Sequence, residues 1–304
     1  MDRAPESNIA VGCNRAWAVA TVLCTVLLFT SVAGQNGPGA PGKFDDFYEV
    51  TWGPDHVTMG DGGASISLSL DQANASAFAS KSKYLFGYFT TGMKLVPGNS
   101  AGTVTAYYFS SETGNVRDEL DFEFLGNSSG DPYILQTNIF ANGVGRREQR
   151  IFLWFDPTAE MHKYSVLWNR NQIVFYVDDY PIRVFENRES EGIAFPTSQP
   201  MGIYASIWNG DSWATQGGLV KLNWTHAPFV STFGDFEIQG CDAVNTVNCA
   251  SSNGWWAGAE YQNMNAADNT KLKWVQQHYM VYDYCYDQSR YTTPPLDCTR
   301  KGVK

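Results

Sequence analysis

The chain has 304 residues, and its 31 acidic and 21 basic side chains give a formal net charge of −10. That charge argues against a nucleic-acid partner, because a phosphate backbone attracts basic surfaces and repels acidic ones. Hydrophobic residues make up 43% of the chain, which is enough for a substantial core and excludes wholesale disorder. The 10 Trp, 16 Tyr and 18 Phe favour an aromatic-rich β core, and their flat faces also suit a neutral carbohydrate partner.

Residues 1–33 have the three parts of a secretory signal peptide. A short polar segment precedes an uncharged, mostly apolar run from Ala16 to Val32, and small residues follow at Ser31, Ala33 and Gly34. The run is shorter than the ~20 residues of a membrane-spanning helix. We therefore expect cleavage near Ala33 rather than an uncleaved anchor, and a secreted protein with no membrane association after cleavage.

The region after the signal is predicted to be rich in β-strands. A glycine-rich leader at 34–42 comes first. Strands are expected where polar and apolar residues alternate or β-branched and aromatic residues cluster, at 65–70, 103–109, 173–177 and 182–185, with a turn at 178–181. Short strands with frequent turn signals indicate a sandwich or barrel. One helix is expected near 270–280. We expect an all-β domain at 43–240 and a C-terminal extension at 241–304 packed onto it.

Cysteines and sequons agree with secretion. Loss of the signal removes Cys13 and Cys24 and leaves four cysteines, an even number that predicts disulfides in a secreted chain. Their spacing does not fit a zinc site. Three pairings are possible, and the simplest closes two short loops, Cys241–Cys249 and Cys285–Cys298. Three N-glycosylation sequons begin at Asn74, Asn127 and Asn223.

The segment Gly98–Gly102 matches the GxSxG motif of serine hydrolases. That motif works as a nucleophile elbow only where a strand precedes the serine and a helix follows it. Here a predicted strand follows at 103–109. We therefore expect a turn at Ser100 and no nucleophile.

The segment 117–127, with the sequence RDELDFEFLGN, is the most informative in the chain. Alternate side chains of a strand point to opposite faces. One face would then be apolar and enter a core, whereas the other would carry Glu119, Asp121 and Glu123. Mutual repulsion of like charges favours keeping one carboxyl protonated, as a general acid requires. The alternatives are a calcium site or a solvated acidic stripe.

Paired carboxylates are the machinery of glycoside hydrolysis, in which one attacks the anomeric carbon and the other exchanges protons with the reacting oxygens. The Cα atoms of Glu119 and Glu123 would lie ~13 Å apart on a strand. Long side chains can close much of that gap, so the spacing leaves the stereochemistry open. Asp121 lies between them and could tune the nucleophile. Carboxylates fill every role, so nothing in the sequence requires a metal or an organic cofactor.

The segment Asp118–Asn127 closely resembles the active-site strand of plant xyloglucan endotransglucosylase/hydrolases, in glycoside hydrolase family 16. The resemblance covers nearly the whole mature chain and continues through 136–138, 147–150, 153–158, 175–179, 198–201, 213–218 and 282–287, with Arg290 and Cys298. It departs at Arg117, where the family often has histidine. That difference does not touch the three acids.

The resemblance implies a β-jelly-roll sandwich of curved antiparallel sheets, an open cleft and a retaining double displacement. It implies Glu119 as the nucleophile, Asp121 as its helper and Glu123 as the acid/base. It also implies a glycan at Asn127 and the two short-loop disulfides. The expected sugar-binding residues are Gln136, Thr137, Asn138, Arg146, Arg147, Glu148, Ser212, Trp213, Gly217 and Arg290.

The expected partners are a xyloglucan donor and a xyloglucan acceptor, in the cell wall and apoplast. We expect transfer to another chain rather than hydrolysis, because the chain has no loop insertion at 138–147 or 208–218 like that of the hydrolytic members. A long acceptor cleft also gives a sugar binding energy that water cannot use. Its aromatic lining would come from Trp208, Trp213, Tyr282 and Tyr284, for which core packing is the alternative. A hydrolase on the same polymer and a non-catalytic carbohydrate-binding protein are the other hypotheses.

Overall fold

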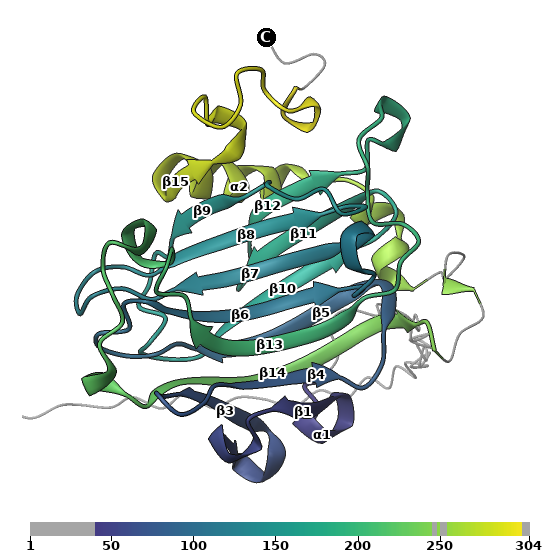
Figure 1. The fold of residues 1–304 in the computed structure, drawn as a ribbon. Coiled ribbons are helices and arrows are strands. Elements are labelled where there is room, and N and C mark those ends of the chain that lie inside the picture. Colours follow the sequence, from purple (N-terminus) through teal and green to yellow (C-terminus); the bar gives the residue numbers. More distant parts are fainter. Residues whose placement is uncertain (1–39, 245–247, 250–253, 300–304) are drawn as a thin grey trace, which may run out of the picture. The chain divides into compact units, whose positions relative to one another are not determined.

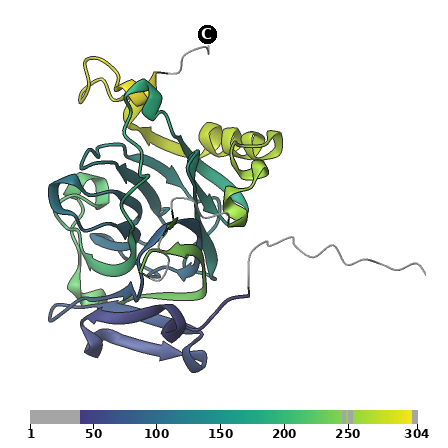
Figure 2. The same ribbon diagram turned by 90° about the vertical axis from the view of Figure 1, so that its right-hand side faces the viewer.

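The computed structural model describes residues 40–244, 248–249 and 254–299. The predicted signal peptide and all but the last three residues of the predicted leader lie outside these ranges. Two antiparallel sheets form the body of the described chain, one in front of the other in Figure 1 and seen from the side in Figure 2. Within the described residues, no helix is both long enough and apolar enough to cross a membrane.

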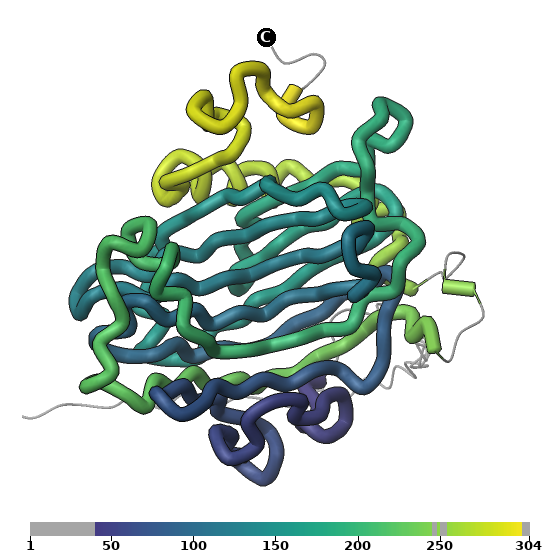
Figure 3. Tube along the Cα trace, in the orientation of Figure 1, coloured from purple at the N-terminus to yellow at the C-terminus, as the bar shows by residue number. Residues whose placement is uncertain are grey.

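The first sheet has eight strands. In spatial order they are β1 (Tyr48–Trp52), β4 (Ser76–Ser80), β13 (Gly202–Asn209), β6 (Thr103–Ser110), β7 (Glu119–Leu125), β8 (Ile134–Phe140), β9 (Gln149–Phe152) and β15 (Met280–Asp283). The N-terminal strand β1 and the C-terminal strand β15 are thus the opposite edges of this sheet, as the chain colours of Figure 3 show.

The second sheet has seven strands. In spatial order they are β12 (Tyr180–Glu186), β11 (Gln172–Val177), β10 (His162–Trp168), β5 (Tyr84–Lys94), β14 (Phe229–Asp242), β3 (Ser65–Leu70) and β2 (Val57–Gly60). The described residues also form two α-helices, the short α1 (Phe44–Phe47) and α2 (Ala266–His278) in the C-terminal extension, and several short 3-10 helices. The two sheets and their structural relatives confirm the predicted all-β jelly-roll class.

Aromatic side chains from both sheets fill the space between them. Phe122 of β7 packs edge-on against Phe175 of β11, with ring centroids 5.1 Å apart. Phe124 packs in the same way against Tyr164 of β10, at 4.7 Å. These rings are fully buried. Their burial fixes which face of β7 points inward, because shifting the strand by one residue would exchange its two faces.

The predicted strands at 65–70 and 103–109 correspond to β3 and β6. The predicted turn at 178–181 is wrong in its second half, because Tyr180 and Pro181 already belong to β12. Pro181 can pair there because β12 is an edge strand, where the missing N–H costs no sheet hydrogen bond. The predicted helix near 270–280 is confirmed, but it begins earlier, at Ala266, where the Asn265 side chain accepts a hydrogen bond from the backbone N–H of Asp268.

The C-terminal extension adds to both sheets. Helix α2 packs on β12, and the chain then runs through β15 into a loop closed by the Cys285–Cys298 disulfide. The second disulfide joins Cys241 at the end of β14 to Cys249. Both predicted pairings are therefore present. The extension places β15 next to β9 on the sheet that carries the three acids.

Candidate active site on the eight-stranded sheet

The three acids of β7 share one face of the eight-stranded sheet, as their alternation predicts. Leu120, Phe122 and Phe124 are fully buried on the opposite face. Neighbouring strands β6 and β8 hold β7 in register, so each acid lies between two known partners. Those pairs are Ser110 and Phe140 for Glu119, Tyr108 and Asn138 for Asp121, and Ala106 and Gln136 for Glu123.

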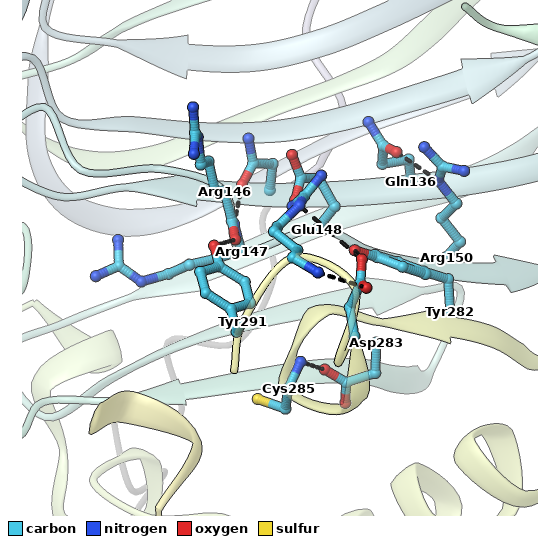
Figure 4. A network of polar contacts seen from close by, with 12 residues as sticks. Gln136, Arg146, Arg147, Glu148, Arg150, Tyr282, Asp283, Cys285 and Tyr291 are labelled. Atoms are coloured by element: carbon cyan, nitrogen blue, oxygen red, sulfur yellow. Dashed lines mark hydrogen bonds and ion pairs between the residues drawn. The ribbon is translucent and has the colours of Figure 1, made fainter. Parts of the chain in front are cut away.

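Glu123 belongs to a hydrogen-bonded chain that crosses three strands. The Gln136 side-chain NH₂ donates to the Glu123 carboxylate at 2.6 Å. The Nε of Arg150 on β9 donates in turn to the Gln136 oxygen at 2.6 Å (Figure 4). Burial raises the pKa of Glu123, the negative charges of Glu148 and Glu119 add to this effect, and Gln136 and Arg150 oppose it. A carboxyl with a raised pKa keeps its proton at higher pH, which suits a general acid.

Asp121 is the most buried of the three acids, with 7% of its surface exposed. Burial raises its pKa well above the usual range, and the charges of Glu119 and Glu123 raise it further, whereas Arg117 and Arg183 lower it. The main cause is therefore loss of solvent, with the predicted repulsion between the acids second. Asn138 beside it is fixed, because its side-chain oxygen accepts hydrogen bonds from the backbone N–H groups of Ile139 and Arg147.

Glu119 is held by Arg117, which lies two residues before it on the same face. Nε and Nη2 of Arg117 donate to the two carboxylate oxygens at 2.9 and 3.2 Å. The guanidinium also lies over the ring of Phe140, 4.2 Å from its centroid. The sequence identified Arg117 only as a departure from the family pattern and missed this ion pair.

Aromatic residues surround the acids on the same face. Tyr108 and Tyr204 stack beside Asp121 with ring centroids 5.1 Å apart. Burial raises the pKa of Tyr108 to about 12, so its phenol stays neutral at physiological pH. Sequence reasoning missed both tyrosines, although the alternation within Thr103–Phe109 places Tyr108 on the opposite face from the core residue Tyr107.

The aromatic candidates for the cleft lining divide into two groups. Trp208 and Trp213 contact each other and pack against a small apolar cluster at one end of the acid face, separate from the main core. Tyr282 of β15 lies beside Arg150, whose guanidinium is 5.3 Å from its ring centroid. Tyr284 is only 4% exposed. The structure therefore puts Trp208, Trp213 and Tyr282 near the acid face and Tyr284 in packing.

The predicted sugar-binding residues also separate by position. Gln136 and Asn138 lie on the acid face, but Thr137 between them points into the core, where its hydroxyl accepts a hydrogen bond from Arg183 of β12 at 3.0 Å. Ser212, Trp213 and Gly217 lie in the connection between β13 and β14. Thr137 is thus placed to join the two sheets and not to contact a ligand on the acid face.

Residues 146–148 contact the C-terminal loop, residues 284–299, at three points, and Figure 4 shows the contact of Arg146 with Tyr291. The Arg146 carbonyl accepts a hydrogen bond from the Tyr291 hydroxyl, and Glu148 forms an ion pair with Arg290. Arg147 pairs with Asp297 at 2.5 Å, and both side chains are only 8% exposed. Arg147 is therefore buried against the extension, whereas Glu148 and Arg290 lie closer to solvent at the edge of the acid face.

Ser100 lies in a turn that leads directly into β6, so the GxSxG segment is not a nucleophile elbow. Its hydroxyl is buried and bonds to the backbone of Asn127. Of the three sequon asparagines, Asn127 donates to the Pro132 carbonyl, Asn74 accepts from the Trp52 indole, and Asn223 accepts from the backbone N–H of Thr225. Glycosylation at these positions stays a prediction.

A sandwich that presents acids of raised pKa on one strand face has the equipment of a carboxylate glycosidase. Comparison with known proteins agrees. The pattern of glycosyl hydrolases family 16 matches residues 44–226, and the pattern of the xyloglucan endo-transglycosylase (XET) C-terminus matches residues 250–298.

Curated relatives match over most of the chain. A xyloglucan endotransglucosylase/hydrolase protein A of Phaseolus angularis is 51% identical over 285 residues, covering 91% of this chain and 97% of the relative. A xyloglucan endotransglucosylase protein 34 of Populus tremula x Populus tremuloides is 54% identical over 255 residues, covering 83% and 86%. The chain therefore belongs to glycosyl hydrolases family 16 and, within it, to the xyloglucan endotransglucosylase/hydrolases, which are retaining enzymes.

Solved structures support the fold. A prokaryotic β-1,3-1,4-glucanase (lichenase) from a mouse hindgut metagenome superimposes with a TM-score of 0.52 at 21% identity, covering 66% of this chain and 97% of that one. A Bacillus licheniformis β-glucanase gives a TM-score of 0.51 at 22% identity, covering 68% and 99%. At this identity the likeness concerns the sandwich alone.

Proposed function

We propose that the protein is a secreted xyloglucan endotransglucosylase. It would cleave the β-1,4-glucan backbone of xyloglucan and join the new end to another xyloglucan chain during cell-wall organisation in the apoplast. The observation that carries this proposal is β7, where three acids share one face and burial raises the pKa of two of them. The names of relatives about 50% identical over most of the chain support xyloglucan as the substrate.

In the proposed first step, Glu119 attacks the anomeric carbon while Glu123 gives its proton to the departing glycosidic oxygen. The product is a covalent ester between Glu119 and the donor sugar. In the second step an acceptor hydroxyl attacks the same carbon, Glu123 takes its proton, and Glu119 leaves as a carboxylate. Asp121, buried between the two glutamates, would limit the negative charge around the nucleophile by keeping its own proton.

The sugar subsites are proposed to be lined by residues at or beside the acid face, namely Gln136, Asn138, Arg146, Glu148, Ser212, Trp213, Gly217 and Arg290. Thr137 and Arg147 would act from behind this face, because the structure bonds their side chains to Arg183 and Asp297.

Transfer over hydrolysis is the finer part of the proposal. Water and an acceptor hydroxyl compete for the glycosyl-enzyme ester, and only the acceptor gains binding energy from a long aromatic surface. Trp208, Trp213 and Tyr282 provide such a surface on the acid-bearing sheet. The connection from β8 to β9, residues 141–148, is short and carries no inserted element.

The proposal is tested by incubating the protein with xyloglucan in the presence and absence of labelled xyloglucan oligosaccharides. Label entering polymer is the expected result. A rise in reducing ends without label transfer would instead identify a hydrolase, and binding without turnover would identify a carbohydrate-binding protein. Glu119→Ala and Glu123→Ala should each abolish turnover in a folded protein, and full activity in Glu119→Ala would refute the nucleophile assignment.

Secretion and glycosylation belong to the same proposal. Expression in a plant secretory host should yield a mature N-terminus near Ala33, and treatment with an N-glycan-removing enzyme should lower the apparent mass. Single Asn→Gln substitutions at Asn74, Asn127 and Asn223 would show which of the three sequons carries a glycan. A full-length N-terminus in the purified secreted protein would contradict the predicted cleavage.

A further inference from the structure

Arg117 forms a two-point ion pair with the carboxylate of Glu119, the proposed nucleophile. Two nitrogens of one guanidinium face the two oxygens of one carboxylate, at 2.9 and 3.2 Å. The Arg117 side chain is 36% exposed and that of Glu119 is 16% exposed, so the pair lies at the open face. Each carboxylate oxygen has two lone pairs, and the guanidinium occupies one of them, which leaves Glu119 able to react.

The surroundings hold the guanidinium in place before any ligand binds. It stacks on Phe140, which lies directly across from Glu119 on β8. Phe140 itself lies against Gly145 so closely that a Cβ there would come within 2.3 Å of the ring. The Arg117 carbonyl accepts a hydrogen bond from Gly143 at 2.8 Å. Because both ends of Arg117 are anchored, its cation costs little entropy to position.

A fixed cation at a carboxylate has opposite effects on two chemical steps. It stabilises the free carboxylate more than the neutral ester, because only the carboxylate carries a full negative charge. It therefore makes Glu119 a weaker attacking group when the ester forms. It also makes Glu119 a better leaving group when the ester breaks, because negative charge returns to the carboxylate in that step.

We propose that Arg117 is a positioning residue that promotes departure of Glu119 from the glycosyl-enzyme ester, so that it governs the second step, in which the acceptor is joined. This inference rests on the proposed role of Glu119 as nucleophile. In that step the bond between the acceptor oxygen and the anomeric carbon forms, and the ester bond to Glu119 breaks. The acceptor proton goes to Glu123, and the electron pair of the broken bond stays on the Glu119 carboxylate that Arg117 binds.

The proposal predicts a particular kinetic pattern for Arg117→Gln with xyloglucan as donor and a labelled xyloglucan oligosaccharide as acceptor. The value of kcat falls by about three- to tenfold, the range between an exposed ion pair and a charge-assisted hydrogen bond. The donor KM falls in step, because the ester accumulates. Since kcat/KM for the donor reports only the first step, it does not fall.

Two further measurements separate this role from a structural one. The fraction of acid-quenched enzyme that carries a covalent sugar, measured by intact-protein mass spectrometry, should rise in Arg117→Gln. In Arg117→Ala, added guanidinium chloride at millimolar concentration should restore part of kcat, and Arg117→Lys should lie between Gln and wild type because lysine offers a charge without the planar fork. The control is Arg170→Gln, which removes another arginine stacked on an aromatic ring, 5.7 Å from Phe86 and on the other sheet. It should change none of these values.

A parallel fall of kcat and kcat/KM with no added covalent enzyme would overturn the proposal, and so would an unchanged kcat. Thermal unfolding of each variant shows whether it is folded. The variant Glu119→Ala distinguishes a failure of the proposed nucleophile from a failure of the proposed role of Arg117. If that variant is active, the proposed nucleophile is wrong. If it is inactive while Arg117→Gln has wild-type kinetics, only the role of Arg117 is wrong.

Discussion

The acid face of β7 and the C-terminal loop, residues 284–299, are held by different forces. On β7, each acid is placed by the backbone register with β6 and β8, strands that run along it from end to end. The loop follows one short strand, β15, which pairs with β9 in an irregular register. The loop itself is closed by the Cys285–Cys298 disulfide, and it is attached to the sheet by a backbone hydrogen bond, from Tyr284 to Glu148, and by side-chain contacts that include the Arg147–Asp297 pair.

The two regions should therefore respond differently to substitution. A ladder of backbone bonds does not depend on the side chains of the acid face, so Glu119, Asp121 and Glu123 can be changed with little effect on the fold, unlike the buried Leu120, Phe122 and Phe124 on the other face. An attachment made of a few buried charges is weakened severely when one partner is lost. Changes on the acid face of β7 should therefore affect the reaction rate, and changes at the loop should affect stability first.

The largest effect is expected on β7 itself. Glu123→Gln removes the proposed general acid and should lower turnover by about 10²–10⁴-fold. The fold should not suffer at neutral pH. Burial raises the pKa of Glu123, so the ionised carboxyl destabilises the folded state, and the stability it contributes when protonated is lost as pH rises through its folded-state pKa.

The melting temperatures of Glu123→Gln and of wild type, measured at acidic and at neutral pH, test this pH dependence. The Gln variant should gain relative to wild type as pH rises. If Glu123→Gln melts at a lower temperature than wild type at neutral pH, then Glu123 also stabilises the fold, contrary to this prediction.

At the loop, Asp297→Ala should cost about 3–5 kcal/mol, because it leaves the Arg147 charge buried without its partner. Denaturant unfolding measures the loss. Glu112→Ala is the matched control, since it breaks an exposed ion pair with Lys83 at 3.0 Å and should cost less than about 1 kcal/mol. Equal costs for the two variants would show that the loop is not held by its buried pair.

Removal of the loop disulfide by Cys285→Ser together with Cys298→Ser should cost about 3 kcal/mol, as expected for a closed loop of this length. Limited proteolysis should then cut within 284–299 before it cuts within the sheets. Loss of the whole fold in a single step, with no early cut in the loop, would show that the two regions unfold together.

The smallest effect is a shift in pH dependence. Gln136→Met removes the NH₂ donor that lowers the pKa of Glu123, so that pKa should rise and the alkaline limb of kcat/KM should move to higher pH. Gln149→Met is the control, because Gln149 on β9 donates to Asp283 and does not contact Glu123. A limb that stays in place would indicate that another group titrates there.

The sequence predicted those features that depend on short-range alternation. The inward and outward faces of β7, the strands β3 and β6, and the turn at Ser100 all follow from spacing along the chain. The disulfides and the sandwich also agree with the structure. These features need only local geometry or the resemblance to a family.

Features that depend on a partner far along the chain could not be predicted. Arg147 reads as a polar residue beside the site, and only the fold shows it buried against Asp297, 150 positions later. Thr137 sits between two site residues, so alternation alone puts it on the opposite face, but only the fold shows its hydrogen bond to Arg183, 46 positions later. Arg117 was visible as an unusual residue, but its contact with Phe140 needed the register of β7 on β8.

The position of β14 has a consequence for how the protein is made. This strand lies between β5 and β3, and a hydrogen bond between the Ser67 and Thr232 hydroxyls joins positions 165 residues apart. At typical rates of synthesis β3 would wait roughly 10–30 s before β14 emerges. Until then the backbone N–H and C=O groups along one edge of β3 can form hydrogen bonds only with water. Its earlier neighbour β2 covers the other edge, and the serines that alternate along Ser65–Leu70 keep β3 half polar, which makes it a poorer template for aggregation during synthesis.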